Sequence, residues 1–208
     1  LAYKYEMTQM PELVSLFNAF GGLCAVIIAI NTGTISALSD QKALSLTVLL
    51  LSIVLGAASF SGSIVAYLKL GGKFKQKIKH TKLWSSVLLL TITLLISLQF
   101  ILNLQLMNSL TLLIIISLLS AGYGVMFASS VGGADMPVLI SLLNAVTGIV
   151  TTFSGILFES PIMLLGGIFV GSTGVLLTVQ MCKAMNRSLI NVLTGQSNTV
   201  MGNSGTGE

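Results

Sequence analysis

The segment GGADMPVLISLLNAVTG, residues 132–148, decides the fold of this chain. It sets an acidic residue and a proline at the start of a long apolar run that carries a serine, an asparagine and a glycine. A second copy of its core opens the chain: MPELVSLFNAFGG at residues 10–22 matches MPVLISLLNAVTG at residues 136–148. Met, Pro, Leu, Ser, Leu, Asn, Ala and the final Gly recur at the same offsets. The chain therefore repeats one helix pattern, with an amide at a fixed depth in each copy.

The composition excludes a soluble domain. Of 208 residues, 54% are hydrophobic and only 8% are charged, whereas about a quarter of a soluble domain is charged. This balance predicts an integral membrane protein with several spans. The net charge of +4 is too small to indicate nucleic acid. Cys24 and Cys182 both lie in apolar runs and are expected to be inert thiols, not a disulfide. Without a His/Cys cluster, no metal site is predicted.

Apolar runs long enough to cross a bilayer divide the chain. They are expected to form an all-α bundle of six transmembrane helices, since strand-like alternation is missing and backbone groups in lipid must pair internally. The expected spans cover residues 11–30, 43–70, 83–102, 109–130, 137–158 and 162–183. Residues 1–187 would form the membrane domain. The Gly/Ser/Asn-rich residues 188–208 would form a linker to a soluble domain, and the opening at Leu1 indicates a piece of a longer chain.

Basic residues predict the orientation. Lysines crowd residues 69–82, between the second and third runs, and Lys4, Lys183 and Arg187 fall on the same side in a chain of six spans. The positive-inside rule places both termini in the cytosol or the mitochondrial matrix. The lysine-rich loop is interpreted as a topology anchor that also attracts anionic headgroups, or as a partner surface.

The repeated helices allow two interpretations. Spacings of three and four put Ser15, Asn18 and Gly22 on one helix face, and Ser141, Asn144 and Gly148 on another. Each Asn lies ~10 Å beyond its Pro, inside the apolar core. Small residues and weak polar pairs would explain close helix packing. Alternatively, Asn18, Asn144 and neighbouring hydroxyls would line a polar path and hold a water chain.

Further small and charged residues extend these candidates. Ala58 and Gly62, with Ser59 and Ser63, form stripes on the second helix, and Gly167 and Gly171 form a GxxxG on the sixth. Close packing is the expected role of these stripes, with Ser63 and Ser172 as additional candidates for the polar path. Glu12, next to Pro11 near the interface, is another pathway candidate. Asp135 precedes a helix N-terminus, where it would cap the helix or serve a functional role.

Four segments carry a family resemblance: EMTQMPELV, SGSIVAYLKL, GGADMPVLISLLN and GSTGVLLTVQMCKAMNRS. They resemble the membrane domain of proton-translocating NAD(P)⁺ transhydrogenase, and more narrowly the later transmembrane helices of its beta-type portion. The resemblance covers about Glu6 to Thr194 and is strongest at both ends and in the second helix. It is weaker in the third and fourth helices.

This resemblance implies a function. The family transfers hydride between NAD(H) and NADP(H) in soluble domains and couples the transfer to proton movement through the membrane domain. The chain itself would then bind no cofactor and hold no catalytic residue. Asn144 and Ser63 match residues of the family's polar path, where many members carry a His at the position of Asn18. The proton-pathway candidates are Asn18, Ser63, Asn144, Ser15, Ser141 and Glu12, and the resemblance assigns Asp135, Ser172, Gly174, Lys183 and Arg187 to coupling with the NADP(H) domain.

The resemblance also implies partners and a location. The partners are the remaining transmembrane helices, the NAD(H)- and NADP(H)-binding domains, lipid, and a second copy in a homodimer. The membrane is the bacterial cytoplasmic membrane or the mitochondrial inner membrane. Two other classes stay open: a secondary transporter built on repeats, and a scaffold subunit that conducts nothing.

Overall fold

A computed structural model describes residues 10–36, 43–72, 87, 90–94 and 109–194. Within these residues every regular element is helical, which confirms the predicted all-α class. The elements are α1 (Met10–Ser36), α2 (Ala43–Leu70), α4 (Ser109–Ser130), the short 3₁₀ turn η3 (Gly133–Asp135), α5 (Met136–Leu157), α6 (Pro161–Ala184) and α7 (Leu189–Thr194).

In the described part of the chain, five helices are long and apolar enough to cross a membrane. These stretches correspond to five of the six predicted spans. They cover Met10–Gly33, Ser45–Leu70, Leu110–Ser130, Gly133–Leu157 and Pro161–Ala184. Most of the predicted span at 83–102 lies outside the described residues, which include only 87 and 90–94 of it.

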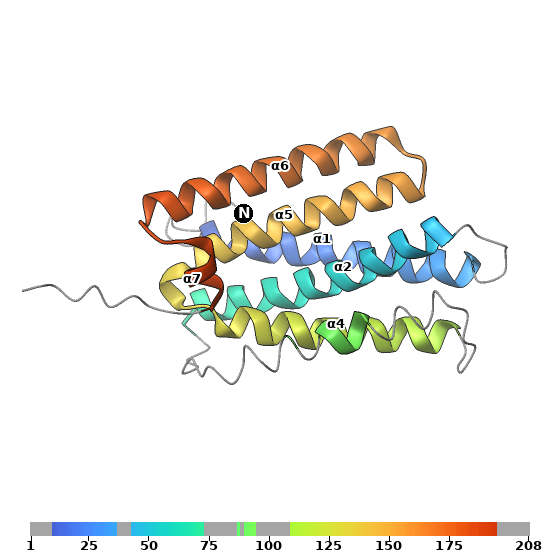
Figure 1. Cartoon of the computed structure of the whole chain (residues 1–208), viewed down its shortest axis with the longest axis horizontal. Helices are drawn as coiled ribbons and strands as arrows, with labels where there is room; N and C mark the ends of the chain where they lie inside the picture. Colours follow the sequence, from blue (N-terminus) through green and yellow to red (C-terminus); the bar gives the residue numbers. More distant parts are fainter. Residues whose placement is uncertain (1–9, 37–42, 73–86, 88–89, 95–108, 195–208) are drawn as a thin grey trace, which may run out of the picture.

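The long helices lie side by side along one axis (Figure 1). Helices α6 and α4 form opposite edges, with α5, α1 and α2 between them. Helix α5 packs on α6, α2 and α1, and α2 packs on α1, α4 and α5. One end of the bundle holds η3, the starts of α1 and α5 and the ends of α2, α4 and α6; we call it the Asp135 end. The turn between α5 and α6, at Glu159, marks the opposite end.

The α5–α6 hairpin brings two backbones into direct contact. A Cβ added at Gly148 would lie 2.3 Å from the backbone nitrogen of Gly171, and one added at Gly167 would lie 2.4 Å from that of Thr152. Side chains cannot occupy such spaces, so only glycine allows this approach. The predicted packing role of the GxxxG on this helix is confirmed.

Both ends of this hairpin close with the same backbone motif. Glu159 and Asn186 adopt a positive φ of 50°. Behind each, a 6→1 hydrogen bond forms: Ser160 N to Gly155 O (2.9 Å), and Arg187 N to Cys182 O (3.0 Å). This arrangement is typical of helix C-termini that end in a left-handed residue. It turns the chain back after α6 and sets the position of Arg187.

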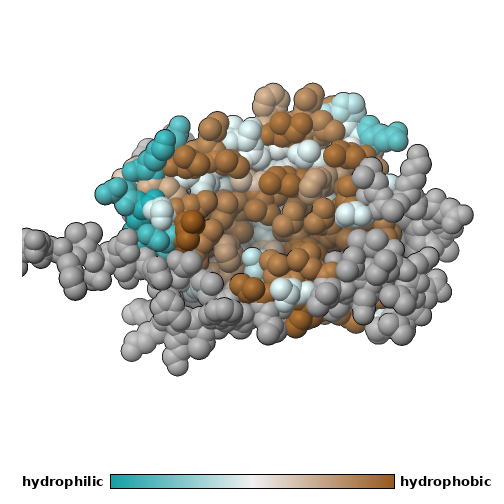
Figure 2. All heavy atoms as spheres, in the orientation of Figure 1, coloured by the Kyte–Doolittle hydropathy of each residue, from teal (hydrophilic) through white to brown (hydrophobic). Residues whose placement is uncertain are grey.

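Apolar side chains fill the interior and also cover the outside. At the Asp135 end, Met136, Leu139 and Val131 are fully buried, and Val192 of α7 joins them. The outer face of α6 exposes Ile162 (84%) and Phe169 (67%). Figure 2 shows apolar residues across the middle of the visible face and hydrophilic ones towards its two ends. Residues 188–208 as a linker stay a prediction, although residues 189–194 form α7.

Candidate functional site

A buried polar network joins α1 to α2. The amide nitrogen Nδ2 of Asn18 donates to Ser63 Oγ (2.9 Å) and, at longer range, to Ser59 Oγ (3.5 Å). One turn earlier, the Ser15 hydroxyl donates to the carbonyl oxygen of Ser63 (2.7 Å). All four side chains are buried. The first copy of the repeated motif therefore presents its polar residues to two serines of the next helix.

The same network continues into α5. The oxygens Ser59 Oγ and Thr147 Oγ1 lie 2.6 Å apart, so one hydroxyl donates to the other. Both hydroxyls also lie within hydrogen-bond distance of the carbonyl oxygen of Leu143, at 3.2 Å from Ser59 and 3.0 Å from Thr147. Ser59 thus connects Asn18 on α1 with Thr147 on α5. Three spans share one continuous set of polar side chains, which we call the Ser59 network (Ser15, Asn18, Ser59, Ser63 and Thr147).

The second copy of the motif forms a separate network with α6. Ser141 Oγ donates to the carbonyl oxygen of Gly174 (3.1 Å). Thr178 Oγ1 lies 3.0 Å from Ser141 Oγ and 2.8 Å from the same carbonyl. Ser141 therefore repeats the bond of Ser15, from a motif serine to a backbone carbonyl of the following helix. Gly174 makes room for it, since an added Cβ there would lie 2.8 Å from Ala145 Cα.

Asn144 differs from its twin. It is half-buried, and within the described part of the chain its side chain has no hydrogen-bond partner. It stands three residues after Ser141 and three before Thr147, so it lies between the two networks along α5. The amide of α5 therefore keeps its donors and its acceptor open, whereas the amide of α1 donates to two serines.

An ion pair closes the Asp135 end. Arg187 Nη1 donates to Asp135 Oδ2 at 2.9 Å, and the aspartate side chain is only 5% exposed against 30% for the arginine. Asp135 precedes α5, but its side chain makes no capping hydrogen bond there, so pairing replaces the alternative capping role. Within the described residues its other oxygen, Oδ1, is buried without a partner. Losing Arg187 would leave a buried carboxylate uncompensated.

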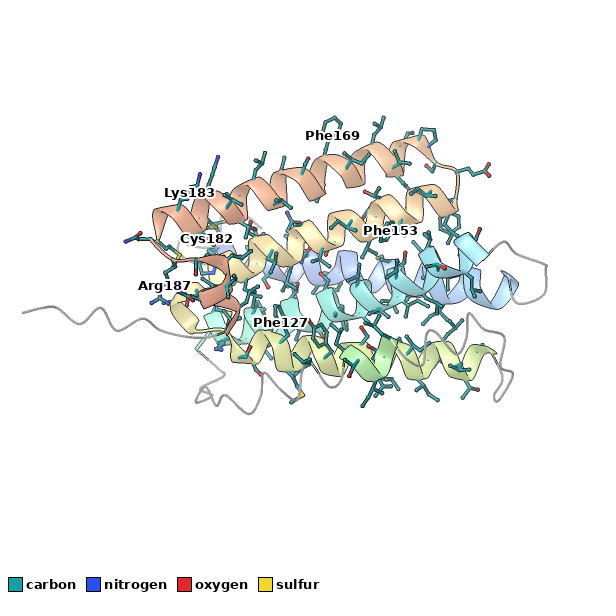
Figure 3. The ribbon with its side chains drawn as sticks, viewed as in Figure 1. Phe127, Phe153, Phe169, Cys182, Lys183 and Arg187 are labelled. Atoms are coloured by element: carbon teal, nitrogen blue, oxygen red, sulfur yellow. The ribbon has the colours of Figure 1, made fainter. Side chains whose placement is uncertain are left out.

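The remaining candidates occupy other surroundings. Ser172 is exposed on α6, and its hydroxyl bonds to its own helix, at Ile168 O (2.7 Å) and Phe169 O (3.1 Å). Lys183 is exposed and points away from the bundle, and Arg187 lies at the same end (Figure 3). Glu12 is half-buried near the end of α2, where a Cβ added at Gly71 would lie 3.9 Å from its Oε2.

Three hydroxyls of these networks were not recognised as such in the sequence. Ser59 was included only in a packing stripe, and neither Thr147 nor Thr178 was singled out. A weak signal exists for two of them, because Thr147 follows Asn144 by three residues and Thr178 follows Gly174 by four. The side chains of the Ser59 network are four hydroxyls and one amide. Such groups hold and orient water but do not themselves change charge.

Fold and site together define a class: a helical-bundle membrane protein whose spans share buried polar networks. The chain belongs to the NAD(P) transhydrogenase beta subunit family, whose model matches residues 1–208. It is 32% identical over 208 residues to the NAD(P) transhydrogenase subunit beta of Rhodospirillum rubrum, and the same match is found for a named strain of that organism. The matched region covers 94% of this chain and 43% of the relative. The chain thus spans less than half of its relatives' length.

Proposed function

We propose that this chain is the proton-conducting membrane part of a nicotinamide nucleotide transhydrogenase, a translocating oxidoreductase. Proton movement through it would be coupled to hydride transfer between NAD(H) and NADP(H), both bound by domains outside these residues. Family membership supports the enzyme class. The observation that carries the conduit is the Ser59 network, a continuous buried set of polar side chains across α1, α2 and α5.

Ser141, Asn144 and Thr147 follow one another along α5 at intervals of three residues, a little less than one turn. From Asp135, the rise per residue places Ser141 at ~9 Å, Asn144 at ~14 Å and Thr147 at ~18 Å along the helix axis. Asn144, with open donors and acceptor, would bridge the Ser141–Thr178 pair and the Ser59 network through water. Protons would pass along that water. One charge moved across 100 mV corresponds to about 2.3 kcal/mol, enough to shift a nearly balanced hydride exchange.

The ion pair is the proposed link to the soluble part. Asp135 and Arg187 lie where the membrane helices end, beside the segment that would lead to the NADP(H)-binding domain. Lys183 is exposed at the same end and would contact that domain. Gly174 and Ser172 would act through α6, Gly174 by fixing the position of α6 against α5.

Six spans with both termini on the cytosolic or matrix side remain part of the proposal. Helices α2 and α4 both end at the Asp135 end. A further crossing between them, at residues 83–102, would connect the two ends of the bundle. The proposed partners are the remaining transmembrane helices, the two nucleotide-binding domains, lipid and a second copy of the enzyme. The membrane would be bacterial cytoplasmic or mitochondrial inner.

The decisive test replaces the two amides in the full-length enzyme, reconstituted in vesicles that contain a pH indicator. Asn18→Leu and Asn144→Leu should each lower proton uptake driven by hydride transfer about tenfold, which is the effect of ~1.4 kcal/mol on a barrier. Thr151→Val is the matched control, because that half-buried hydroxyl bonds only to its own helix, at Thr147 O. Undiminished proton uptake in both amide variants would reject the assignment of these two amides to the proton route.

A further inference from the structure

The lysines near residue 70 were interpreted as one group that sets topology, but Lys69 stands apart from a simple surface charge. It lies in the last turn of α2 and is half-buried. Its ammonium donates to the carbonyl oxygen of Ser129 (3.1 Å) and to that of Val131. These carbonyls lie in the last turn of α4 and one residue beyond it, sixty or more residues further along the chain. A lysine of one span is therefore bonded to the backbone end of another.

The chemistry of this contact is favourable. The last carbonyls of an α-helix lack partners within the helix, and the helix dipole makes that end attractive to a cation. Lys69 supplies both a charge and several donors at this point. Ser129, Ser130 and Val131 are buried, so their carbonyls have limited access to water.

The contact stands directly before the turn that carries Asp135. Val131 is followed by Gly132, whose carbonyl oxygen accepts a hydrogen bond from Asp135 N (3.1 Å). Gly133 and Ala134 are exposed, so packing holds the outer part of this turn only weakly. The Asp135 carboxylate is held by Arg187 through one oxygen, while the other has no partner within the described residues. Residues 129–131 are therefore one of the two backbone supports of this turn, the other being the buried Met136 at the start of α5.

We infer that Lys69 is a positioning residue: by binding the carbonyls of Ser129 and Val131 it fixes the end of α4 and so holds the η3 turn in the place where Asp135 meets Arg187. The consequence for coupling rests on the proposed function, whereas the anchoring of the turn does not. A lysine that only sets topology would act through its charge, wherever its side chain lies. A positioning lysine acts through these two hydrogen bonds.

The test uses the full-length enzyme in lipid nanodiscs and in vesicles. Lys69→Met removes the ammonium and keeps an apolar stem, and Lys73→Met removes an equal charge four residues later. Hydrogen exchange of the amides at 132–135 should be at least tenfold faster in Lys69→Met, with no change at 158–160, the turn at the other end. Protons moved per hydride should fall severalfold. Lys69→Arg should restore both quantities, and Lys73→Met should leave both unchanged.

Two results would overturn the inference: unchanged exchange at 132–135 in Lys69→Met, or an equal effect of Lys73→Met, which would make the role one of charge. If Lys69→Met does not accumulate in the membrane, Lys69→Gln is subjected to the same two measurements and the same criteria apply. The proposed function is tested by a different measurement, so the two hypotheses can be rejected independently. Proton uptake that survives Asn18→Leu and Asn144→Leu would refute the conduit, while faster exchange in Lys69→Met would still establish the anchoring of the turn.

Discussion

At the scale of single residues, Asn18 and Asn144 occupy the same position in the repeated motif but lie in different environments. Asn18 meets serines at positions 59 and 63 of the helix that follows it. Counting from the carbonyl that each motif serine binds, Ser63 corresponds to Gly174, and Ser59 corresponds to Val170. The helix after Asn144 thus offers no hydroxyl at the matching places. The amide of Asn18 is therefore held by two hydrogen bonds, whereas the amide of Asn144 can still bind other groups.

Ser59 is the residue on which the continuity of the network depends. Ser59→Ala removes the oxygen that lies between Asn18 and Thr147, so proton uptake coupled to hydride transfer should fall about tenfold. The stability cost should be small, about 0.6 kcal/mol, the average for polar pairs between membrane helices. Proton uptake in vesicles and thermal unfolding in detergent measure the two effects separately.

Ser52 is the matched control for this substitution. It lies seven residues earlier on α2 and is equally buried, but its hydroxyl bonds only to Val48 O of its own helix (2.9 Å). Ser52→Ala should leave proton uptake within twofold of the unsubstituted enzyme, a difference of about 0.4 kcal/mol. Equal rates for the two alanine variants would show that the bridge across Ser59 carries no protons.

Spacing identified some of these residues from the sequence and not others. The pattern placed Ser15, Asn18 and Gly22 on one face, and all three lie against α2. On α6 the hydroxyl candidate was Ser172, which follows the GxxxG, yet that residue is exposed and Thr178 is the buried hydroxyl. A helix that is apolar all round gives no amphipathic signal to show which face turns inward. Only the packing of α6 on α5 determines which face of α6 is buried.

At the scale of elements, the α5–α6 pair depends on backbone contact. Gly148→Ala would place a methyl group 2.3 Å from Gly171 N and 2.6 Å from its Cα, and neither backbone can move aside alone. We expect the helices to separate, at a cost of about 3 kcal/mol, the upper part of the range for overpacking. Thermal unfolding of the purified protein should show this as a large loss of stability.

Gly166 provides the comparison, since an added Cβ there would meet nothing within 4 Å. Gly166→Ala should be neutral or stabilising by up to about 1 kcal/mol, because alanine favours the helix over glycine. If the two alanine substitutions have similar effects, the contact at Gly148 does not determine the packing of this hairpin.

Helix limits followed from the length of apolar runs, with one informative exception. The predicted spans at 43–70 and 109–130 have the bounds of α2 and α4, and those at 137–158 and 162–183 differ by one residue at each end. The first helix was expected to end at Ile30, but α1 continues to Ser36. Thr32 explains part of this, since its hydroxyl bonds to Ile28 O (2.9 Å) and is satisfied inside the helix. Polar residues therefore did not end the helix.

At the scale of the whole molecule, the two ends of the bundle differ in charge. Among the described residues, the Asp135 end holds three basic residues, Lys69, Lys183 and Arg187, against the two acidic residues Glu12 and Asp135, and the opposite end holds Glu159. If the positive-inside rule holds, the η3 turn faces the cytosol or matrix. Single cysteines at Gly133 and Phe158, both exposed, report the two ends in an enzyme whose native cysteines are replaced.

A reagent that does not cross membranes should label Phe158→Cys, but not Gly133→Cys, in intact cells or in mitochondria without their outer membrane. In inverted vesicles the pattern should reverse. Labelling of Gly133→Cys from the outside would contradict both the predicted orientation and the placement of a nucleotide-binding domain beside Asp135.

The direct contact between Gly148 and Gly171 has a mechanical consequence. Because the two backbones touch at these glycines, no layer of side chains separates α5 from α6, and neither helix can slide or rotate past the other. We therefore expect α5 and α6 to move together as one rigid body. A displacement that starts near Arg187 would then change mainly the interface of α5 with α1 and α2. The hydroxyl groups there can rotate and exchange hydrogen-bond partners at little cost in free energy.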